Sequence, residues 1–373
     1  MDNLIEKRIN ILRKDLEKNN LDTLMILVEQ NRHYLSGYTG EDTQFDETAG
    51  ALFITPDQLV LATDSRFDLQ AKKEAPLYEV ITYKKGLEKE ISSIARKLKT
   101  KRMGFESIRL TMLQFQKIRK ELDDQHQSGI ELIDTENMVE KLRMIKEEFE
   151  ICALKDALKI AENVFYEFFP HLRPGMTEKE ISWQLEKRMR EAGADALSFP
   201  TIVASGPNSA LPHAVVSDRK IKEGEPLLFD WGVKLKGYCS DISRTVILGT
   251  PDNTFRKIFQ TVYDAQQKAI ESMKPGMTGK QVDQVAREYI DGTEFKEKFS
   301  HGLGHGTGLA VHEGPRLSPL REDVLEPGMV VTVEPGIYIP EWGGVRLENM
   351  VVLRDYGAEV LNETDSSQFN ILD

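Results

Sequence analysis

The sequence predicts an α+β protein with two domains, a smaller α/β domain over residues 1–134 and a larger, pseudo-symmetric domain over residues 135–373. The first domain is indicated by short apolar runs that alternate with amphipathic helical segments, a pattern typical of helices packed on a sheet. The second domain is indicated by a change of pattern at Thr135 and by two similar passages 101 residues apart. A chain of 373 residues is long enough for each domain to bury its own core.

The first domain is expected to form a series of helices and strands. Its opening segment, residues 4–20, places apolar side chains at helical spacing. We expect strands at residues 21–28, 50–56, 59–66, 103–105 and 130–134, and further helices at residues 66–73, 87–98 and 111–122. The nucleotide-binding patterns GxGxxG and GxxxxGK[ST] do not occur in this region, so a phosphate-binding loop is not expected.

The second domain opens with a long amphipathic stretch, residues 139–172, which predicts helix broken near Pro170. Two passages then recur, RPGMTEKE at residues 173–180 and KPGMTGKQ at residues 274–281. The threonine of each passage stands where it would cap a following helix, and a glutamate completes a capping box in the first. The second domain is therefore interpreted as two related halves that meet at one site.

Composition limits the classes of function. The formal net charge of −12 argues against a nucleic-acid partner. No apolar run is long enough for a membrane span, and the N-terminus lacks the pattern of a signal peptide. The two cysteines, Cys152 and Cys239, form no CxxC pair. We therefore expect a cytoplasmic protein without a disulfide framework.

Two aspartates occupy neighbouring strands in the segment that follows. Asp230 interrupts an apolar strand, and Asp241 begins the next. A hairpin that turns at Lys236-Gly237 would bring the two carboxylates almost opposite each other. Because two bare carboxylates at that distance repel, the pair needs a cation, a proton or an arginine, and Arg244 is one candidate partner.

Two glutamates repeat this arrangement nearer the C-terminus. Glu334 ends a β-branched strand, and Glu348 lies in the strand that returns after Gly343-Gly344. A carboxylate inside such an apolar strand must be paired or bound to a metal.

A glycine-rich segment, residues 299–313, holds three of the seven histidines, at His301, His305 and His312. Repeated glycine is unfavourable inside helices and strands, so this backbone is expected to pass close to something bound. Histidine at this density indicates a metal ligand together with groups that handle protons. A surface loop with solvated histidines is the alternative interpretation.

The candidate metal ligands are four carboxylates and one imidazole, namely Asp230, Asp241, His305, Glu334 and Glu348. This oxygen-rich set suits Mn²⁺, Mg²⁺ or another divalent ion better than structural zinc. The negative charge is balanced best by two divalent ions, which together can activate a hydroxide. The chemistry indicated is metal-assisted hydrolysis.

These segments resemble the metallopeptidases of the pita-bread fold, a family that includes methionine aminopeptidase, aminopeptidase P, prolidase and the non-metal relative creatinase. The resemblance lies in FDWGVKLKGYCSDISRT, HGLGHGTGLAVHEGP, MVVTVEPGIY and GVRLENMVV, which follow the family's order and spacing. The passage KLRMIKEEFEI, at residues 141–151, resembles the start of the catalytic domain in the proline-specific branch. The resemblance thus implies a creatinase-like N-terminal domain followed by a pita-bread catalytic domain.

The resemblance also implies roles for the five ligands. Asp230 would bind one metal, and Asp241 and Glu348 would bridge two. His305 and Glu334 would complete the second metal, and Glu334 would also pass a proton from water to the leaving nitrogen.

Five further residues match positions near the family's active site. His213 and His312 match two catalytic histidines that steady the substrate and the oxyanion. His301 matches a histidine on the proline side. Tyr338 and Arg346 match substrate-proximal positions, and Arg346 would pair either with the ligand carboxylates or with a substrate terminus.

The function implied is a cytoplasmic, homodimeric exopeptidase that uses two divalent ions to cleave an N-terminal residue from a following proline in small peptides. Manganese is the first candidate ion, and Co²⁺, Zn²⁺ and Fe²⁺ are alternatives. Because proline's tertiary amide has no N–H, peptidases that require that donor fail on it. Aminopeptidase P and prolidase activities both remain open, and an inactive binding protein or a hydrolase of a non-proline substrate are the alternatives.

Overall fold

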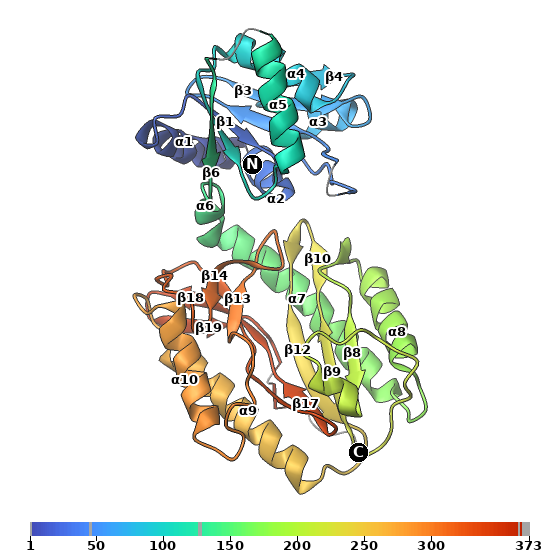
Figure 1. Cartoon of the computed structure of the whole chain (residues 1–373). Helices are drawn as coiled ribbons and strands as arrows, with labels where there is room; N and C mark the ends of the chain where they lie inside the picture. The colour runs from blue at the N-terminus through green and yellow to red at the C-terminus, as the bar shows by residue number, and fades with distance from the viewer. Residues whose placement is uncertain (1, 45–46, 126–128, 365, 368–373) are drawn as a thin grey trace. The chain divides into compact units, whose positions relative to one another are not determined.

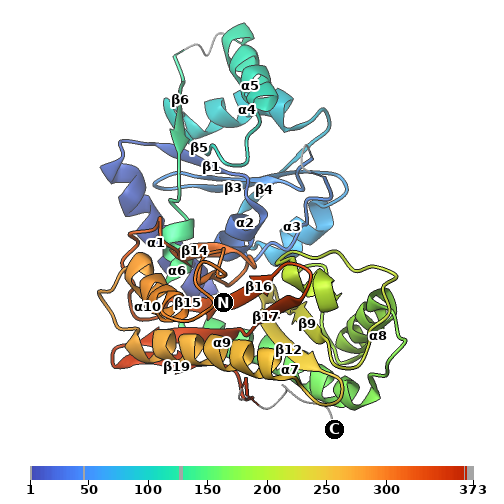
Figure 2. The same cartoon turned by 60° about the horizontal axis from the view of Figure 1, so that its bottom comes forward.

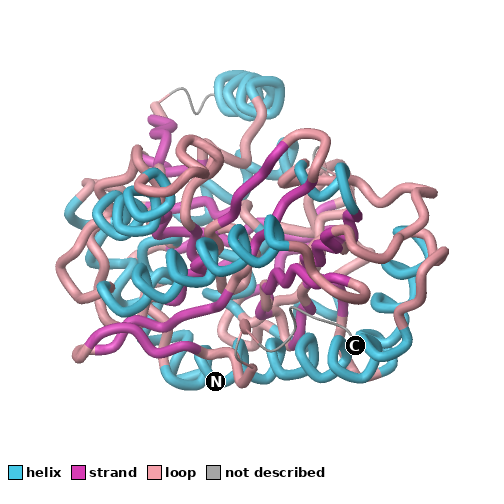
Figure 3. The backbone as a smooth tube through the Cα atoms, turned by 90° about the horizontal axis from the view of Figure 1, so that it is seen from below, coloured by secondary structure: helices cyan, strands magenta, loops and turns pink. Residues whose placement is uncertain are grey.

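A computed structural model of the chain describes residues 2–44, 47–125, 129–364 and 366–367. They form two compact units, Met1–Arg143 and Met144–Asp373 (Figure 1). Helices and strands are mixed in both units, in agreement with the expected α+β class (Figure 3). None of the described helices is both long and apolar enough to cross a membrane.

The first unit is a mixed six-stranded sheet with the strand order β4-β3-β2-β1-β5-β6. Apolar side chains of β1, β2, β5 and α4 form its core, including Met25, Phe53 and Ile91. Its elements are α1 (Asp2–Lys18), β1 (Thr23–Ile26), α2 (Glu29–Ser36), β2 (Ala51–Ile54), β3 (Leu59–Asp64), α3 (Asp68–Glu74), β4 (Glu79–Tyr83), α4 (Leu87–Leu98), β5 (Arg102–Glu106), α5 (Met112–Asp124), β6 (Glu131–Thr135) and α6 (Glu140–Met144). Every strand and helix expected here is present, whereas α2 and β4 were not expected.

The division between the units falls after Arg143, whereas the sequence analysis places the domain boundary after residue 134. Hydrogen bonds from Arg143 to Asn31 and from Tyr34 to the Leu142 carbonyl tie this segment to the first unit. The expected long helix from residue 139 is also broken earlier than Pro170, between α6 and α7. Lys146 N–H donates to the Gly328 carbonyl there, so a tertiary contact replaces the helical hydrogen bond.

The second unit consists of small antiparallel sheets covered by four long helices. Its sheets have the orders β12-β9-β8, β14-β13-β15-β18-β19, β11-β10-β7 and β16-β17. Its helices are α7 (Glu148–Phe168), α8 (Glu178–Glu191), α9 (Asn253–Ser272) and α10 (Gly279–Asp291), with short 3₁₀ helices at Phe169–His171 and Gly206–Ala210. Its strands are β7 (Ala196–Leu197), β8 (Ile202–Ser205), β9 (Pro226–Trp231), β10 (Val233–Leu235), β11 (Tyr238–Cys239), β12 (Ile242–Ile247), β13 (Gly304–Gly306), β14 (Glu313–Leu317), β15 (Val330–Val333), β16 (Gly336–Ile339), β17 (Gly343–Arg346), β18 (Asn349–Arg354) and β19 (Gly357–Val360).

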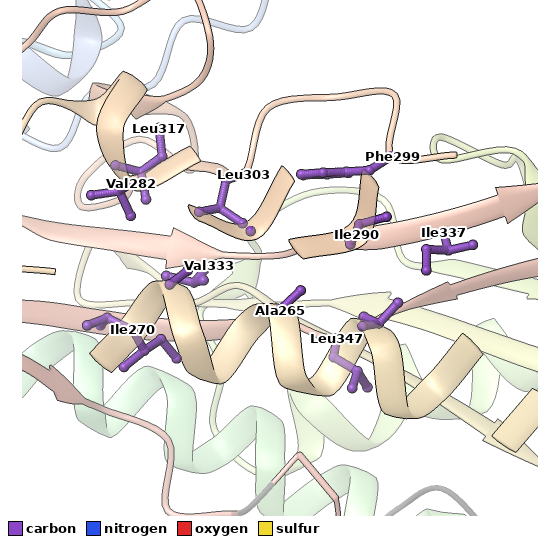
Figure 4. Close-up of a cluster of buried hydrophobic side chains, with 14 of the residues drawn as sticks. Ala265, Ile270, Val282, Ile290, Phe299, Leu303, Leu317, Val333, Ile337 and Leu347 are labelled. Atoms are coloured by element: carbon purple, nitrogen blue, oxygen red, sulfur yellow. The ribbon is translucent and has the colours of Figure 1, made fainter. Parts of the chain in front are cut away.

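A large apolar cluster fills the C-terminal half of this unit. Helix α9 lies along β15, β16 and β17 (Figure 2). Its inward face, with Ala265 and Ile270, packs on Val333 of β15, Ile337 of β16 and Leu347, which directly follows β17 (Figure 4). This packing fixes the strands that flank the two glutamates against a single helix.

The expected duplication is visible in the hydrogen bonds of the two PGMT passages. Thr177 and Thr278 cap α8 and α10, and each forms a capping box with the residue three positions later. The preceding glycines also match, because Gly175 N–H donates to the Ile221 carbonyl and Gly276 N–H donates to the Leu325 carbonyl. The two halves of the second unit therefore start their helices in the same way.

Candidate active site

The two aspartates lie on a hairpin, residues 226–247, here called the aspartate hairpin. Lys236 and Gly237 form its tip with φ values of 51° and 86°, as a tight hairpin turn requires. In the ladder, Asp230 pairs with Ser243 and Trp231 pairs with Ile242. Asp241 immediately precedes this ladder, so the two aspartates are diagonal neighbours, as the turn position predicts.

An arginine does pair with an aspartate here, but it is not Arg244. Arg346 Nη2 donates to Asp230 Oδ2 over 2.7 Å. The buried guanidinium of Arg244 instead donates to the Glu348 carbonyl and to Asn349 Oδ1. Arg244 thus supports the main chain beside Glu348, and the other oxygen of Asp230, Oδ1, is buried without a hydrogen-bond partner among the described residues.

The two glutamates lie on a second hairpin, residues 330–354, here called the glutamate hairpin. Val333 pairs with Asn349 on one side of the glutamates, and Gly336 pairs with Arg346 on the other. Glu334 and Glu348 therefore stand opposite each other. Contrary to expectation, Glu348 is not inside a strand but in the gap between β17 and β18, and it is 1% exposed.

Ser243 links the two hairpins beside Glu348. Glu348 N–H donates to the Ser243 carbonyl, and Ser243 Oγ donates to Glu348 Oε2 over 2.8 Å. Arg346 Nε in turn donates to Ser243 Oγ over 2.9 Å. This hydroxyl thus fixes one glutamate oxygen and leaves the other available.

His305 presents an unprotonated nitrogen to the carboxylates. Its Nδ1 lies 3.0 Å from the Gly306 carbonyl, to which it must donate, so Nε2 carries the lone pair. Burial, with the neighbouring His312, lowers the pKa of His305 to about 3. Nε2 lies 3.5 Å from both Asp241 Oδ2 and Glu334 Oε1, where a neutral imidazole can act as a ligand.

A cavity of about 480 Å³ brings these side chains together. Nine of the ten residues singled out from the sequence line it, namely His213, Asp230, Asp241, His301, His305, His312, Glu334, Arg346 and Glu348. The tenth, Tyr338, contacts two of these residues instead. Apolar side chains, including Phe199, Pro200 and Ile202, form another part of the lining.

Tyr338 connects two lining residues through its hydroxyl. Arg346 Nη1 donates to the Tyr338 hydroxyl over 3.0 Å, and that hydroxyl lies 2.8 Å from His301 Nε2. His301 Nδ1 lies 2.8 Å from the Gly302 carbonyl, so Nε2 is the acceptor from tyrosine. Burial, with the nearby Arg346 charge, lowers the pKa of His301 to about 4.

The donor set fits divalent metal ions. Three ligand atoms of Asp230, Asp241 and Glu348 lie within 4.8 Å of one another, and so do those of His305, Glu334 and Glu348. Burial and the neighbouring carboxylates raise the pKa values of Asp241 and Glu348 well above their ordinary range. Burial also raises the pKa of Glu334 to about 8. Buried carboxylates that repel one another, one with an unpartnered oxygen, are the arrangement that bound cations would stabilise.

One charged residue of the cavity lining was missed by the sequence analysis. Arg316, on β14, is exposed and lines the cavity, and it forms no ion pair with a carboxylate of the described residues. It stands four residues after His312 in HEGPR, but a single arginine in a strand gives no pattern that distinguishes it from a surface charge.

Comparison with known proteins gives consistent matches over the whole chain. Residues 152–355 match metallopeptidase family M24, and residues 8–145 match the creatinase/prolidase N-terminal domain. The chain is 35% identical to the Xaa-Pro dipeptidase of Pyrococcus furiosus over 97% of this chain and 99% of that protein.

Two solved structures are similar throughout. One is an Xaa-Pro dipeptidase from Bacillus anthracis, with a TM-score of 0.91, 38% identity and coverage of 99% of this chain and 100% of that chain. The other is an X-Pro aminopeptidase from Thermotoga maritima, with a TM-score of 0.88, 35% identity and coverage of 98% and 99%. These matches confirm the resemblance and the fold class expected from the sequence.

Proposed function

Because the chain belongs to metallopeptidase family M24, we propose that it hydrolyses the bond between an N-terminal residue and a following proline, with dipeptides as preferred substrates. The observation that carries the choice of dipeptides is Arg316, a cavity-lining cation that forms no ion pair with a carboxylate of the described residues. Aminopeptidase P activity on longer peptides is the second candidate, and it is favoured by the similarity to the Thermotoga maritima structure.

The five proposed ligands would hold two divalent ions. Asp230 would hold one ion, and Asp241 and Glu348 would lie between the two. His305 and Glu334 would complete the other. When bound, the ions supply Lewis acidity toward the scissile carbonyl and toward water.

The protein's own groups would orient the substrate and move protons. Glu334 would accept a proton at its carboxylate and deliver it to the proline nitrogen as the bond breaks. His213 and His312, both exposed and lining the cavity, would donate hydrogen bonds to the substrate and to the developing oxyanion. The Tyr338 hydroxyl would hold His301 in one tautomer beside the proline.

Arg316, rather than Arg346, would bind the carboxylate terminus of a dipeptide. Arg346 is 2% exposed and already engaged by Asp230, Ser243 and Tyr338. Arg316 is exposed at the cavity, so its guanidinium can form a charge-assisted pair with a carboxylate. A longer peptide places its carboxylate elsewhere and would gain little from this contact.

Manganese is the proposed ion, with Co²⁺, Zn²⁺ and Fe²⁺ as alternatives, because the donors are mostly carboxylate oxygens. A homodimer is proposed from the resemblance. A cytoplasmic location is proposed because Cys152 and Cys239 are both free thiols.

The first experiment compares hydrolysis of Ala-Pro and Ala-Pro-Ala by metal-free protein, with and without added Mn²⁺ or Co²⁺. Metal-dependent cleavage of the dipeptide, with little cleavage of the tripeptide, is expected. Equal or better cleavage of the tripeptide would make the protein an aminopeptidase P. If neither peptide is cleaved with any ion, the proline-peptidase proposal is wrong.

Arg316→Met tests the carboxylate site, with Arg321→Met, an exposed arginine outside the cavity lining, as the matched control. A hydrogen bond to a charged group is worth about 1.5–3 kcal/mol, so KM for Ala-Pro should rise roughly 10- to 100-fold. Cleavage of the tripeptide and the control variant should change little. Equal loss on both peptides would contradict this role for Arg316.

A further inference from the structure

A polar side chain lies at the centre of the apolar cluster behind the glutamate hairpin. Gln266, on α9, is 0% exposed. An amide buried in this way is unfavourable unless its donors and acceptor are paired. Gln266 Nε2 donates to the Val333 carbonyl and to the Leu347 carbonyl, each over 2.9 Å. Its Oε1 accepts from Ser366 Oγ over 3.0 Å, so both ends of the amide are satisfied.

The two carbonyls that Gln266 binds belong to the residues directly before Glu334 and Glu348. The side chains of Val333 and Leu347 face α9, which places both segments of the hairpin against this helix (Figure 4). One nitrogen atom therefore connects the main chains that carry the two glutamates.

The pairing within the hairpin holds these positions only weakly. Its ladder stops at the Val333–Asn349 pair and resumes at the Gly336–Arg346 pair. Within the gap, the glutamate N–H groups bond elsewhere, because Glu334 N–H donates to the Leu303 carbonyl and Glu348 N–H donates to the Ser243 carbonyl. Among the described residues, one hydrogen bond crosses the gap, a long one of 3.4 Å from Leu347 N–H to the Pro335 carbonyl. A bond of this length is weak, so the spacing of the two glutamates depends mainly on contacts from outside the hairpin.

We propose that Gln266 is a positioning residue that sets the separation of Glu334 and Glu348 and thereby the affinity of the site for divalent metal. Glutamine suits this task because one Nε2 supplies two N–H donors while Oε1 still accepts a hydroxyl. A glutamate in place of Gln266 would direct acceptor oxygens toward two carbonyls, which are also acceptors. An aliphatic residue in its place would leave both carbonyls buried and unpaired. The inference rests on the metal site proposed above but not on the substrate.

The test measures Mn²⁺ binding to metal-free protein by titration calorimetry, without any peptide. Gln266→Met keeps an unbranched side chain of similar size and removes both donors. Removing a group that orients metal ligands typically lowers metal affinity by about 10- to 100-fold. A loss of about that size is expected for Gln266→Met. Gln260→Leu, an exposed glutamine on the same helix, is the control and should bind Mn²⁺ as the unaltered protein does.

A second variant and a second measurement separate positioning from general stability. Ser366→Ala keeps both Nε2 donors of Gln266 but removes the hydroxyl that binds Oε1 and orients the amide. A smaller loss of Mn²⁺ affinity, roughly 2- to 10-fold, is therefore expected. The rise in Tm on adding Mn²⁺ should also be smaller for Gln266→Met than for the unaltered protein. A purely structural role would instead lower Tm equally with and without the ion.

The outcomes distinguish the two proposals. If the unaltered protein binds no divalent ion, the metal site itself is wrong. If it binds Mn²⁺ and both Gln266→Met and Ser366→Ala bind it equally well, the role of Gln266 is overturned while the metal site stands. Should Gln266→Met fail to fold, Ser366→Ala decides alone, and unchanged affinity in that variant overturns the inference.

Discussion

The aspartate hairpin and the glutamate hairpin present two carboxylates each, but different contacts hold them in place. Behind the aspartates, Phe165 of α7 stacks on Trp231 with ring centroids 4.4 Å apart, and it meets Phe229 edge-on at 5.0 Å. Behind the glutamates, Gln266 of α9 binds two main-chain carbonyls. Phe165 and Gln266 are separated by the same 101 residues as the two PGMT passages. Equivalent helical positions in the two halves thus hold an aromatic ring and an amide.

The difference follows from the ladders. The aspartate hairpin is paired continuously through Asp230 and is interrupted only at Asp241, so most of its main chain is fixed by the ladder and packing supports it. The glutamate hairpin is interrupted at both glutamates and needs directed hydrogen bonds instead. A duplicated scaffold can therefore place ligands by packing in one half and by hydrogen bonding in the other.

The largest expected effect comes from removing the carboxylate that is proposed to be shared by both ions. Glu348→Gln should reduce kcat/KM roughly 10³-fold or more, because Lewis acidity contributes several kcal/mol and about 1.4 kcal/mol is tenfold in rate. Steady-state kinetics on Ala-Pro with Mn²⁺ would measure this loss. Glu341→Gln, at the exposed tip of the same hairpin, is the control and should keep its activity. Near-normal activity of Glu348→Gln would remove Glu348 from the ligand set.

The next largest effect is expected from removing Trp231, the ring that packs behind the aspartates. Trp231 is 0% exposed, and its indole N–H donates to the Ala161 carbonyl. Trp231→Ala should lower the free energy of unfolding by about 3–5 kcal/mol through the cavity that it leaves. Denaturant unfolding would measure this change, and Trp183→Ala, at a tryptophan that is 66% exposed, should change stability far less. A small effect at Trp231 would mean that the aromatic stack does not support the aspartate half.

The metal-free protein should become less stable as pH rises. The folded state holds protons on Glu334, Asp241 and Glu348 more tightly than the unfolded chain does, because burial raises their pKa values, to about 8 for Glu334. The stability from these protonated groups is therefore full below the ordinary carboxyl pKa and is lost as pH rises toward 8. His301 and His305, whose pKa values are lowered, oppose this trend below the ordinary histidine pKa, so the measurement is made above it. Tm measured from pH 7 to pH 9 in a chelator should fall, and saturating Mn²⁺ should remove most of the fall. A Tm that rises over this range without metal would contradict the repulsion between these carboxylates.

The smallest effect is expected from removing the threonine caps that the two halves of the second unit share. Thr177→Ala and Thr278→Ala should each cost about 1 kcal/mol of stability, because each removes an equivalent helix cap. Urea unfolding of the single and double variants should give similar and additive losses. Thr261→Ala, inside α9, is a non-capping control. Clearly unequal losses would show that the caps are not equivalent in the two halves.

Local chemistry made much of this fold predictable. The Lys236-Gly237 turn fixes the register of the aspartate hairpin, so the diagonal placement of Asp230 and Asp241 followed from the turn alone. The threonine caps and the strand pair 50–66 were likewise set by residues close together in the chain.

The features that were missed depend on distant residues. Helix α2 buries Arg32 against Asp42, a contact that hydrophobic periodicity does not register. The break before α7 is made by Gly328, far along the chain. Arg316 and Gln266 are single residues whose importance comes from the cavity and the strand carbonyls that they reach, and neither can be inferred from spacing.

The two-hairpin design also bears on the order of folding. Each hairpin brings its own pair of carboxylates together by pairing residues that are close in the chain, and such local contacts cost less loop-closure entropy than distant ones. The four carboxylates meet only when the two halves dock, and that contact spans distant segments of the chain. Electrostatic repulsion is thus concentrated in the docking step, and a divalent cation at the proposed site would favour that step because only the docked halves offer it all five proposed ligands. In this design the proposed catalytic ion would also be the ligand that completes the fold.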